Sequence, residues 1–155
     1  MGNWLRHPSG RGVFLPNIIE ELVLILFSQR SLSRSTRIMA MLLTLGIVVS
    51  LFVGGAQPVA VNLIPSPWDK LAHGVTFALL ACAIGVASGL SDWQRLILAF
   101  FGSLLVGLLD EWHQVYLPGR QAGWPDLIAD VVGSALGTAL LAMERIWRNQ
   151  HDSSI

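Results

Sequence analysis

The sequence predicts an all-α membrane protein, a bundle of four transmembrane helices with both termini in the cytoplasm. Of its 155 residues, 53% are hydrophobic and only 13% are charged, which is too apolar for an ordinary soluble domain of this size. Because lipid cannot hydrogen-bond the backbone, a chain crosses it as helices or as a closed barrel, and the long apolar runs here do not alternate as barrel strands do. Ten Lys and Arg balance ten Asp and Glu, so the net charge argues against a nucleic-acid partner.

Residues 1–37 are predicted to form an N-terminal extension that is disordered or lies at the membrane interface. Its apolar piece, residues 18–27, has ten residues, whereas a spanning helix needs about 20. Glu20 and Glu21 deprive that piece of the basic face that favours anionic lipid. A biological start at Met39 or Met41 is an alternative.

Residues 38–143 are predicted to form the four-helix membrane domain, and residues 144–155 a short cytoplasmic tail. The apolar runs that predict the four spans are residues 38–56, 66–90, 96–109 and 127–143. Pro58 and Pro65 end the first helix before the second begins. Ser66 is the expected N-cap of the second span, with Pro67 at its first helical position and Asp69 placed as in a capping box. The single cysteine, Cys82, falls inside an apolar run and is interpreted as a small core residue.

The distribution of basic residues predicts the orientation. Four spans put both termini on one side, together with most of the arginines: Arg30, Arg34, Arg37, Arg95, Arg145 and Arg148. Only Lys70 and Arg120 fall on the other side. The positive-inside bias therefore places the termini in the cytoplasm and the two polar loops outside.

Polar residues recur at helical spacing near the outward ends of three spans. Because residues three or four apart share a helix face, three polar rows are expected: Asp69, His73 and Thr76; Ser103, Gly107, Asp110 and Gln114; and Asp126, Asp130, Gly133 and Gly137. Ionisable groups at the ends of spanning helices are costly and mark a functional site by default. The rows are expected to converge at the outer end.

Two glycines suggest how the helices pack. Gly133 and Gly137 form a small-xxx-small motif, which lets helices approach closely in lipid. Ser103 and Gly107 are the expected opposing surface, and close packing there would bring Asp110 and Asp130 together.

Two neighbouring carboxylates in a low dielectric need a nearby cation or a proton. Arg120 follows a Pro-Gly turn and is expected to clamp the carboxylates and brace its loop. For His73, beside Asp69, a structural role and a role as proton carrier both stay open, and His113 is a weaker candidate. No metal-ligand spacing is present, so neither a metal nor another cofactor is predicted.

Taken in order, these motifs resemble the VanZ-like family of small bacterial integral membrane proteins. The resemblance lies in Asp69-Lys70-Leu-Ala-His73, in Gly107-Leu-Leu-Asp110-Glu111-Trp-His-Gln114, in Pro118-Gly119-Arg120, and in Asp126, Asp130 and the two glycines after them. It covers residues 38–143 and leaves the first 37 residues outside. It implies a multi-pass protein of the bacterial cytoplasmic membrane that serves the cell envelope. The glycopeptide resistance of the family's name-giving member does not carry over.

The leading functional hypothesis is that the outer polar cluster binds a lipid or cell-wall precursor head group without covalent chemistry. The predicted binding residues are Asp69, Lys70, His73, Asp110, Glu111, Gln114, Arg120, Asp126 and Asp130. One alternative is a membrane enzyme acting on a lipid-linked phosphate or sugar, with Asp110, Glu111 or His73 as general acid or base. Another is a purely structural ion network. Membrane lipids are the expected partners, and a homo-oligomer is left open.

Overall fold

The computed structural model describes residues 33–60, 63–120 and 123–152. This part contains helices α2 (Arg34–Val49), α3 (Trp68–Ser88), α4 (Asp92–Gln114) and α5 (Trp124–Asp152), and no strand. A π-helical turn, Ser50–Gly54, continues α2, and a short 3-10 helix, Pro58–Ala60, follows it. Four helices are long and apolar enough to cross a membrane, which confirms the predicted fold class. The predicted apolar piece at residues 18–27 lies outside the described residues.

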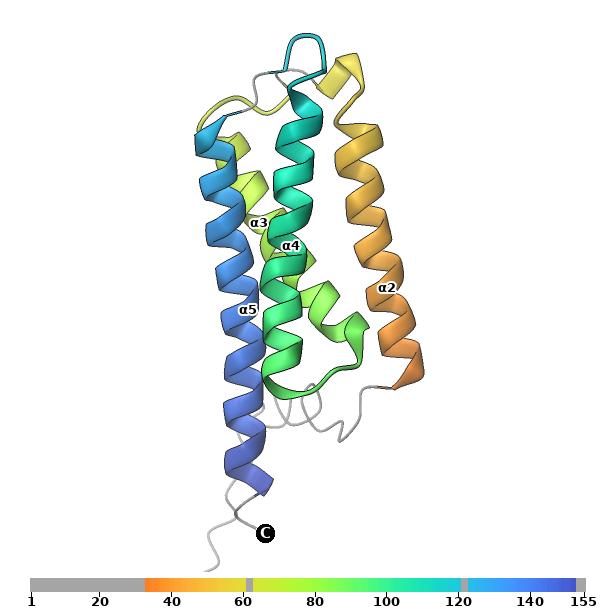
Figure 1. The fold of residues 1–155 in the computed structure, drawn as a ribbon, viewed down its shortest axis with the longest axis vertical. Coiled ribbons are helices and arrows are strands. Elements are labelled where there is room, and N and C mark those ends of the chain that lie inside the picture. Colours follow the sequence, from red (N-terminus) through yellow and green to blue (C-terminus); the bar gives the residue numbers. More distant parts are fainter. Residues whose placement is uncertain (1–32, 61–62, 121–122, 153–155) are drawn as a thin grey trace, which may run out of the picture. The chain divides into compact units, whose positions relative to one another are not determined.

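The four helices run alongside one another, with α3 in contact with each of the other three (Figure 1). The closest packing is between α3 and α5, while α2 packs mainly on α3. The start of α2 and the end of α5 lie at one end of the bundle, and the α2–α3 and α4–α5 connections lie at the other (Figure 1). The two polar loops therefore share one end, as expected. The side of the membrane that this end faces stays a prediction.

Two glycines of α5 explain its close approach to α3. A Cβ atom added at Gly133 would lie 2.2 Å from the carbonyl oxygen of Gly74, and one added at Gly137 would lie 2.3 Å from that of Ala78. The packing role of this motif is confirmed, but the expected opposing surface on α4 is wrong, because α5 meets the small residues of α3 instead. Cys82 lies at this contact, where its Sγ donates to the Gly137 carbonyl at 3.3 Å.

The contact of α4 with α5 depends on a different glycine. At Gly107 an added Cβ would lie 3.0 Å from Asp130 Oδ2 and 3.1 Å from the ring of Phe77. The absent side chain therefore leaves room for the Asp130 carboxylate between α3, α4 and α5. Asp110 and Asp130 are near enough to interact electrostatically, as the sequence predicts.

Two helix starts differ from the expectation. The first helix begins at Arg34, where the Ser33 side chain accepts a hydrogen bond from the Thr36 amide, so its first arginines lie inside the helix. The N-cap of α3 is Pro67, which has no capping side-chain hydrogen bond. The prediction of Ser66 as the N-cap is therefore wrong. Proline fixes the backbone there, and the Trp68 amide donates to the Pro65 carbonyl instead.

The last helix is longer than predicted. Instead of ending at residue 143, α5 continues to Asp152. Its last turns are held to the start of α4 by ion pairs from Arg95 to Glu144 (3.0 Å) and from Arg145 to Asp92 (2.8 Å), and Arg148 also pairs with Glu144. These pairs lie where α4 begins, opposite the two polar loops.

Candidate functional site

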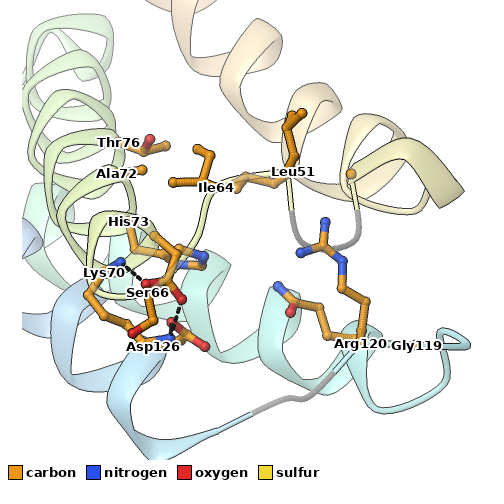
Figure 2. Close-up of a pocket in the computed structure, with 14 residues that line it drawn as sticks. Leu51, Ile64, Ser66, Lys70, Ala72, His73, Thr76, Gly119, Arg120 and Asp126 are labelled. Carbon is orange, nitrogen blue, oxygen red and sulfur yellow. Dashed lines mark hydrogen bonds and ion pairs between the residues drawn. The ribbon is translucent and has the colours of Figure 1, made fainter.

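A cavity of about 570 Å³ lies at the end of the bundle where the two polar loops meet. Its walls come from α3, α5, the last residue of α4, the turn after α4 and the segment after α2 (Figure 2). Six predicted site residues line it: Asp69, Lys70, His73, Gln114, Arg120 and Asp126. Three do not: Asp110, Glu111 and Asp130. Apolar residues of the segment between α2 and α3, including Leu51 and Ile64, also line the cavity.

Lys70 joins the starts of α3 and α5. Its Nζ donates to Asp69 Oδ2 at 2.7 Å and also to Asp126 Oδ1. The Asp69 carboxylate accepts a second hydrogen bond from the Lys70 amide at 2.8 Å. Asp69 therefore holds Lys70 rather than completing a capping box.

His73 reaches across to α5. Its Nδ1 lies 2.8 Å from Asp130 Oδ1, and the Asp130 side chain is fully buried whereas that of His73 is 20% exposed. The imidazole also stacks nearly parallel to the ring of Phe77, with an interplanar angle of 12°. The sequence predicts Asp69 as the neighbour of His73, but the partner that bonds to the ring is Asp130.

Beneath the cavity, α4 contributes a second carboxylate layer. Asp110 is buried, and its Oδ2 accepts a hydrogen bond from Gln114 Nε2 at 2.8 Å. Oδ1 of Asp110 and Oδ2 of Asp130 are buried and have no hydrogen-bond partner within the described part of the chain. Unpaired buried carboxylate oxygens are expensive. The prediction that Ser103, Asp110 and Gln114 share one face of the helix is confirmed, and the structure shows that this face is buried.

Glu111 has a local role. Its Oε2 accepts a hydrogen bond from the Gly123 amide at 2.8 Å, which ties the end of α4 to the residue before α5. Its side chain does not line the cavity.

Arg120 does not clamp the carboxylates, so that prediction is wrong. Its Nε and Nη2 donate to the carbonyl oxygen of Gly55 at 3.2 and 2.8 Å. Gly55 follows the last residue of the π-helical turn, where carbonyls have no intrahelical donor, so its carbonyl is free to accept them. The predicted turn before Arg120 is present, with Gly119 at φ 79° and the Arg120 amide donating to Leu117. Arg120 therefore braces the α4–α5 loop against the end of α2.

Among the residues that the structure describes, no group of three or more His, Cys, Asp and Glu side chains is arranged to hold a metal ion. Three residues were not singled out in the sequence. Gly55 accepts the hydrogen bonds of Arg120 through its carbonyl, and Gly74 and Ala78 contact the glycines of α5. Gly74 and Ala78 are four residues apart, so a search for paired small residues on the second span would have found them.

The helices and this cavity define a multi-pass α-helical membrane protein with a polar pocket at one end of its bundle. A sequence model of the VanZ/LLP1 family matches residues 21–147, and the chain belongs to that family. The match begins well before residue 38, so the expectation that the first 37 residues lie outside is wrong for residues 21–37. No curated protein and no solved structure matches the chain.

Proposed function

We propose that this membrane protein binds the phosphate-bearing head group of an envelope lipid or a lipid-linked cell-wall precursor in the polar pocket. The observation that carries the proposal is the position of Arg120. Its guanidinium lines the cavity, yet within the described part of the chain no carboxylate pairs with it.

The bonding of Arg120 leaves capacity for an anion. A guanidinium has five N–H donors, and the only acceptor of Arg120 in the described residues is the neutral carbonyl of Gly55. A phosphate oxygen is a better acceptor, because charge-assisted hydrogen bonds to guanidinium are about twice as strong as neutral ones. An anionic head group in the pocket would therefore bind the guanidinium together with the Gly55 carbonyl or in place of it.

The opposite wall offers further polar contacts. Lys70 has three donors, of which the carboxylates of Asp69 and Asp126 take two. His73 faces the same cavity (Figure 2). A head group between Arg120 and Lys70 would meet cations on both sides, and pockets of roughly 300–1,000 Å³ are typical of small-molecule sites.

The charge distribution favours an outward-facing pocket. The described arginines at the far end of the bundle are Arg34, Arg37, Arg95, Arg145 and Arg148, whereas only Lys70 and Arg120 lie at the pocket end. By the positive-inside bias, the far end faces the cytoplasm. The pocket then opens on the side where envelope precursors are used.

The test is binding of phosphate-bearing lipids to the purified protein in phosphatidylcholine nanodiscs, titrated with phosphatidic acid. Arg120→Gln should weaken binding about tenfold to 100-fold, since a hydrogen bond to a charged group contributes roughly 1.5–3 kcal/mol. Arg34→Gln, an exposed arginine at the other end, is the matched control and should not change affinity. Equal affinities of the two variants would contradict the proposal.

The second candidate is a structural ion network, and the pairing of Lys70 favours it. Lys70, Asp69 and Asp126 satisfy one another and join α3 to α5. If this is their whole purpose, replacing all three by neutral residues would lower stability and leave lipid binding unchanged. Arg120 lies outside this network, so it separates the two candidates.

A further inference from the structure

His73 is held in one orientation by two residues that do not line the pocket, Asp130 and Phe77. The fully buried Asp130 fixes its Nδ1, and Phe77 stacks on its ring. The remaining nitrogen, Nε2, belongs to a side chain that lines the cavity and has no hydrogen-bond partner among the described residues. Figure 2 shows His73 extending from α3 into the space between Lys70 and Arg120.

This arrangement suits proton transfer. When a carboxylate accepts the Nδ1 proton, the neutral imidazole presents a lone pair at Nε2, and the carboxylate stabilises the imidazolium that forms when Nε2 takes a proton. A structural histidine needs no cavity in front of Nε2. Here the side chain that carries the second nitrogen lines a pocket that Lys70 and Arg120 also line.

We propose that the pocket hydrolyses a lipid diphosphate, with His73 as general base; this inference rests on the proposed function and names its substrate class. His73 Nε2 removes a proton from a water molecule while the water oxygen attacks the terminal phosphorus. A new P–O bond forms, and the bond from that phosphorus to the bridging oxygen breaks. The bridging oxygen keeps the electron pair on the lipid monophosphate, inorganic phosphate is released, and His73 returns its proton to solvent.

The number of proton carriers selects a diphosphate. His73 is the one imidazole among the described lining residues, and the carboxylates of Asp69 and Asp126 are engaged with Lys70. A phosphomonoester would leave as an alkoxide and would need a second group to protonate it. A diphosphate leaves as a phosphate, which needs no proton, while Lys70 and Arg120 stabilise the charge that develops.

Asp130 is a positioning residue in this scheme, because it is fully buried and does not line the pocket. Asp130→Asn weakens the orientation of His73 without removing a substrate contact. It should lower kcat and leave KM within a few-fold of wild type.

The experiment uses the full chain in phosphatidylcholine vesicles, with farnesyl diphosphate as substrate probe and release of inorganic phosphate as the readout. His73→Asn keeps a donor for Asp130 but removes the base, and it should reduce the rate by about 10²-fold or more. His113→Asn is the matched control: His113 lies against Phe52 in a separate apolar recess, and its loss should leave the rate unchanged. His73→Gln serves as a second variant. The rate is compared between the wild type and the variant whose unfolding temperature equals that of the wild type.

A methylene-bridged analogue of farnesyl diphosphate measures binding separately. Binding of the analogue without phosphate release by the wild type overturns hydrolysis and leaves the proposed function standing. Absence of analogue binding overturns the diphosphate substrate, and absence of phosphatidic acid binding as well overturns the proposed function. If His73→Asn and His73→Gln both release phosphate at the wild-type rate, the role of His73 is overturned.

Discussion

Gly133→Ala is expected to separate α3 from α5 and to disturb the pocket with them. The new Cβ would lie 2.2 Å from the Gly74 carbonyl oxygen, about 1.2 Å short of an ordinary contact of 3.4 Å. A backbone oxygen cannot rotate away, so the helices themselves must move. Gly74 follows His73 directly, and Gly133 is one turn from Asp130. A shift of that size would lengthen the 2.8 Å hydrogen bond between His73 Nδ1 and Asp130 Oδ1 to about 4 Å, beyond hydrogen-bond range.

The expected cost follows from these two effects. Overpacking costs about 1–3 kcal/mol, and loss of a hydrogen bond to a charged group costs roughly 1.5–3 kcal/mol. Because the helices relieve one strain by accepting the other, we expect a loss of about 2–4 kcal/mol in the free energy of unfolding. The measurement is denaturant-induced unfolding in mixed micelles, followed by tryptophan fluorescence.

Gly46→Ala is the matched control. Gly46 lies on α2, and an added Cβ there meets nothing within 4 Å. Alanine favours a helix over glycine by up to about 1 kcal/mol, so this variant should be as stable as the wild type or slightly more so. If Gly133→Ala behaved like Gly46→Ala, the close contact between α3 and α5 would be refuted.

Three further substitutions test the ion pairs and the buried carboxylates. Lys70→Met should lower unfolding free energy by no more than about 1 kcal/mol, because the side chain is 32% exposed; a much larger loss would show a pair more deeply buried than the structure has it. Asp110→Asn should be neutral or stabilising, since the amide oxygen can still accept from Gln114 while the buried charge disappears; a loss above about 2 kcal/mol would speak against this. Arg145→Ala breaks the pair with Asp92, so amide hydrogen exchange should increase in the last turns of α5, and unchanged protection would exclude a role in holding that end.

Helical periodicity was sufficient to predict which polar residues share a helix face. The row from Ser103 to Gln114 on α4 shares one face as predicted, and that face is buried. The spacing of Gly133 and Gly137 correctly predicted close packing, because small residues four apart form a flat face. Periodicity gives the face of a helix but not its neighbour. The opposing helix was therefore predicted as α4 when it is α3.

The partners of long side chains could not be predicted in this way. Arg120 was assigned to the carboxylates by charge alone. Its actual acceptor, the Gly55 carbonyl, is 65 residues away and lies at the end of the π-helical turn that follows α2, a position that charge alone does not indicate. The end of α5 was misplaced for a related reason. In the sequence Glu144 indicates the start of a polar tail, because its ion pair with Arg95 of α4 is evident only in the structure.

We propose that the loops before α3 and after α4 meet on the non-cytoplasmic side of the membrane and form one pocket. Single cysteines at Ser66, Ser91 and Pro118 in a Cys82→Ala background, probed in intact cells with a membrane-impermeant maleimide, test it most directly; all three positions are exposed. Labelling is expected at Ser66 and Pro118 in intact cells, and at Ser91 only after permeabilisation. Labelling of Ser66 and Pro118 from opposite sides, or of both only after permeabilisation, would contradict it.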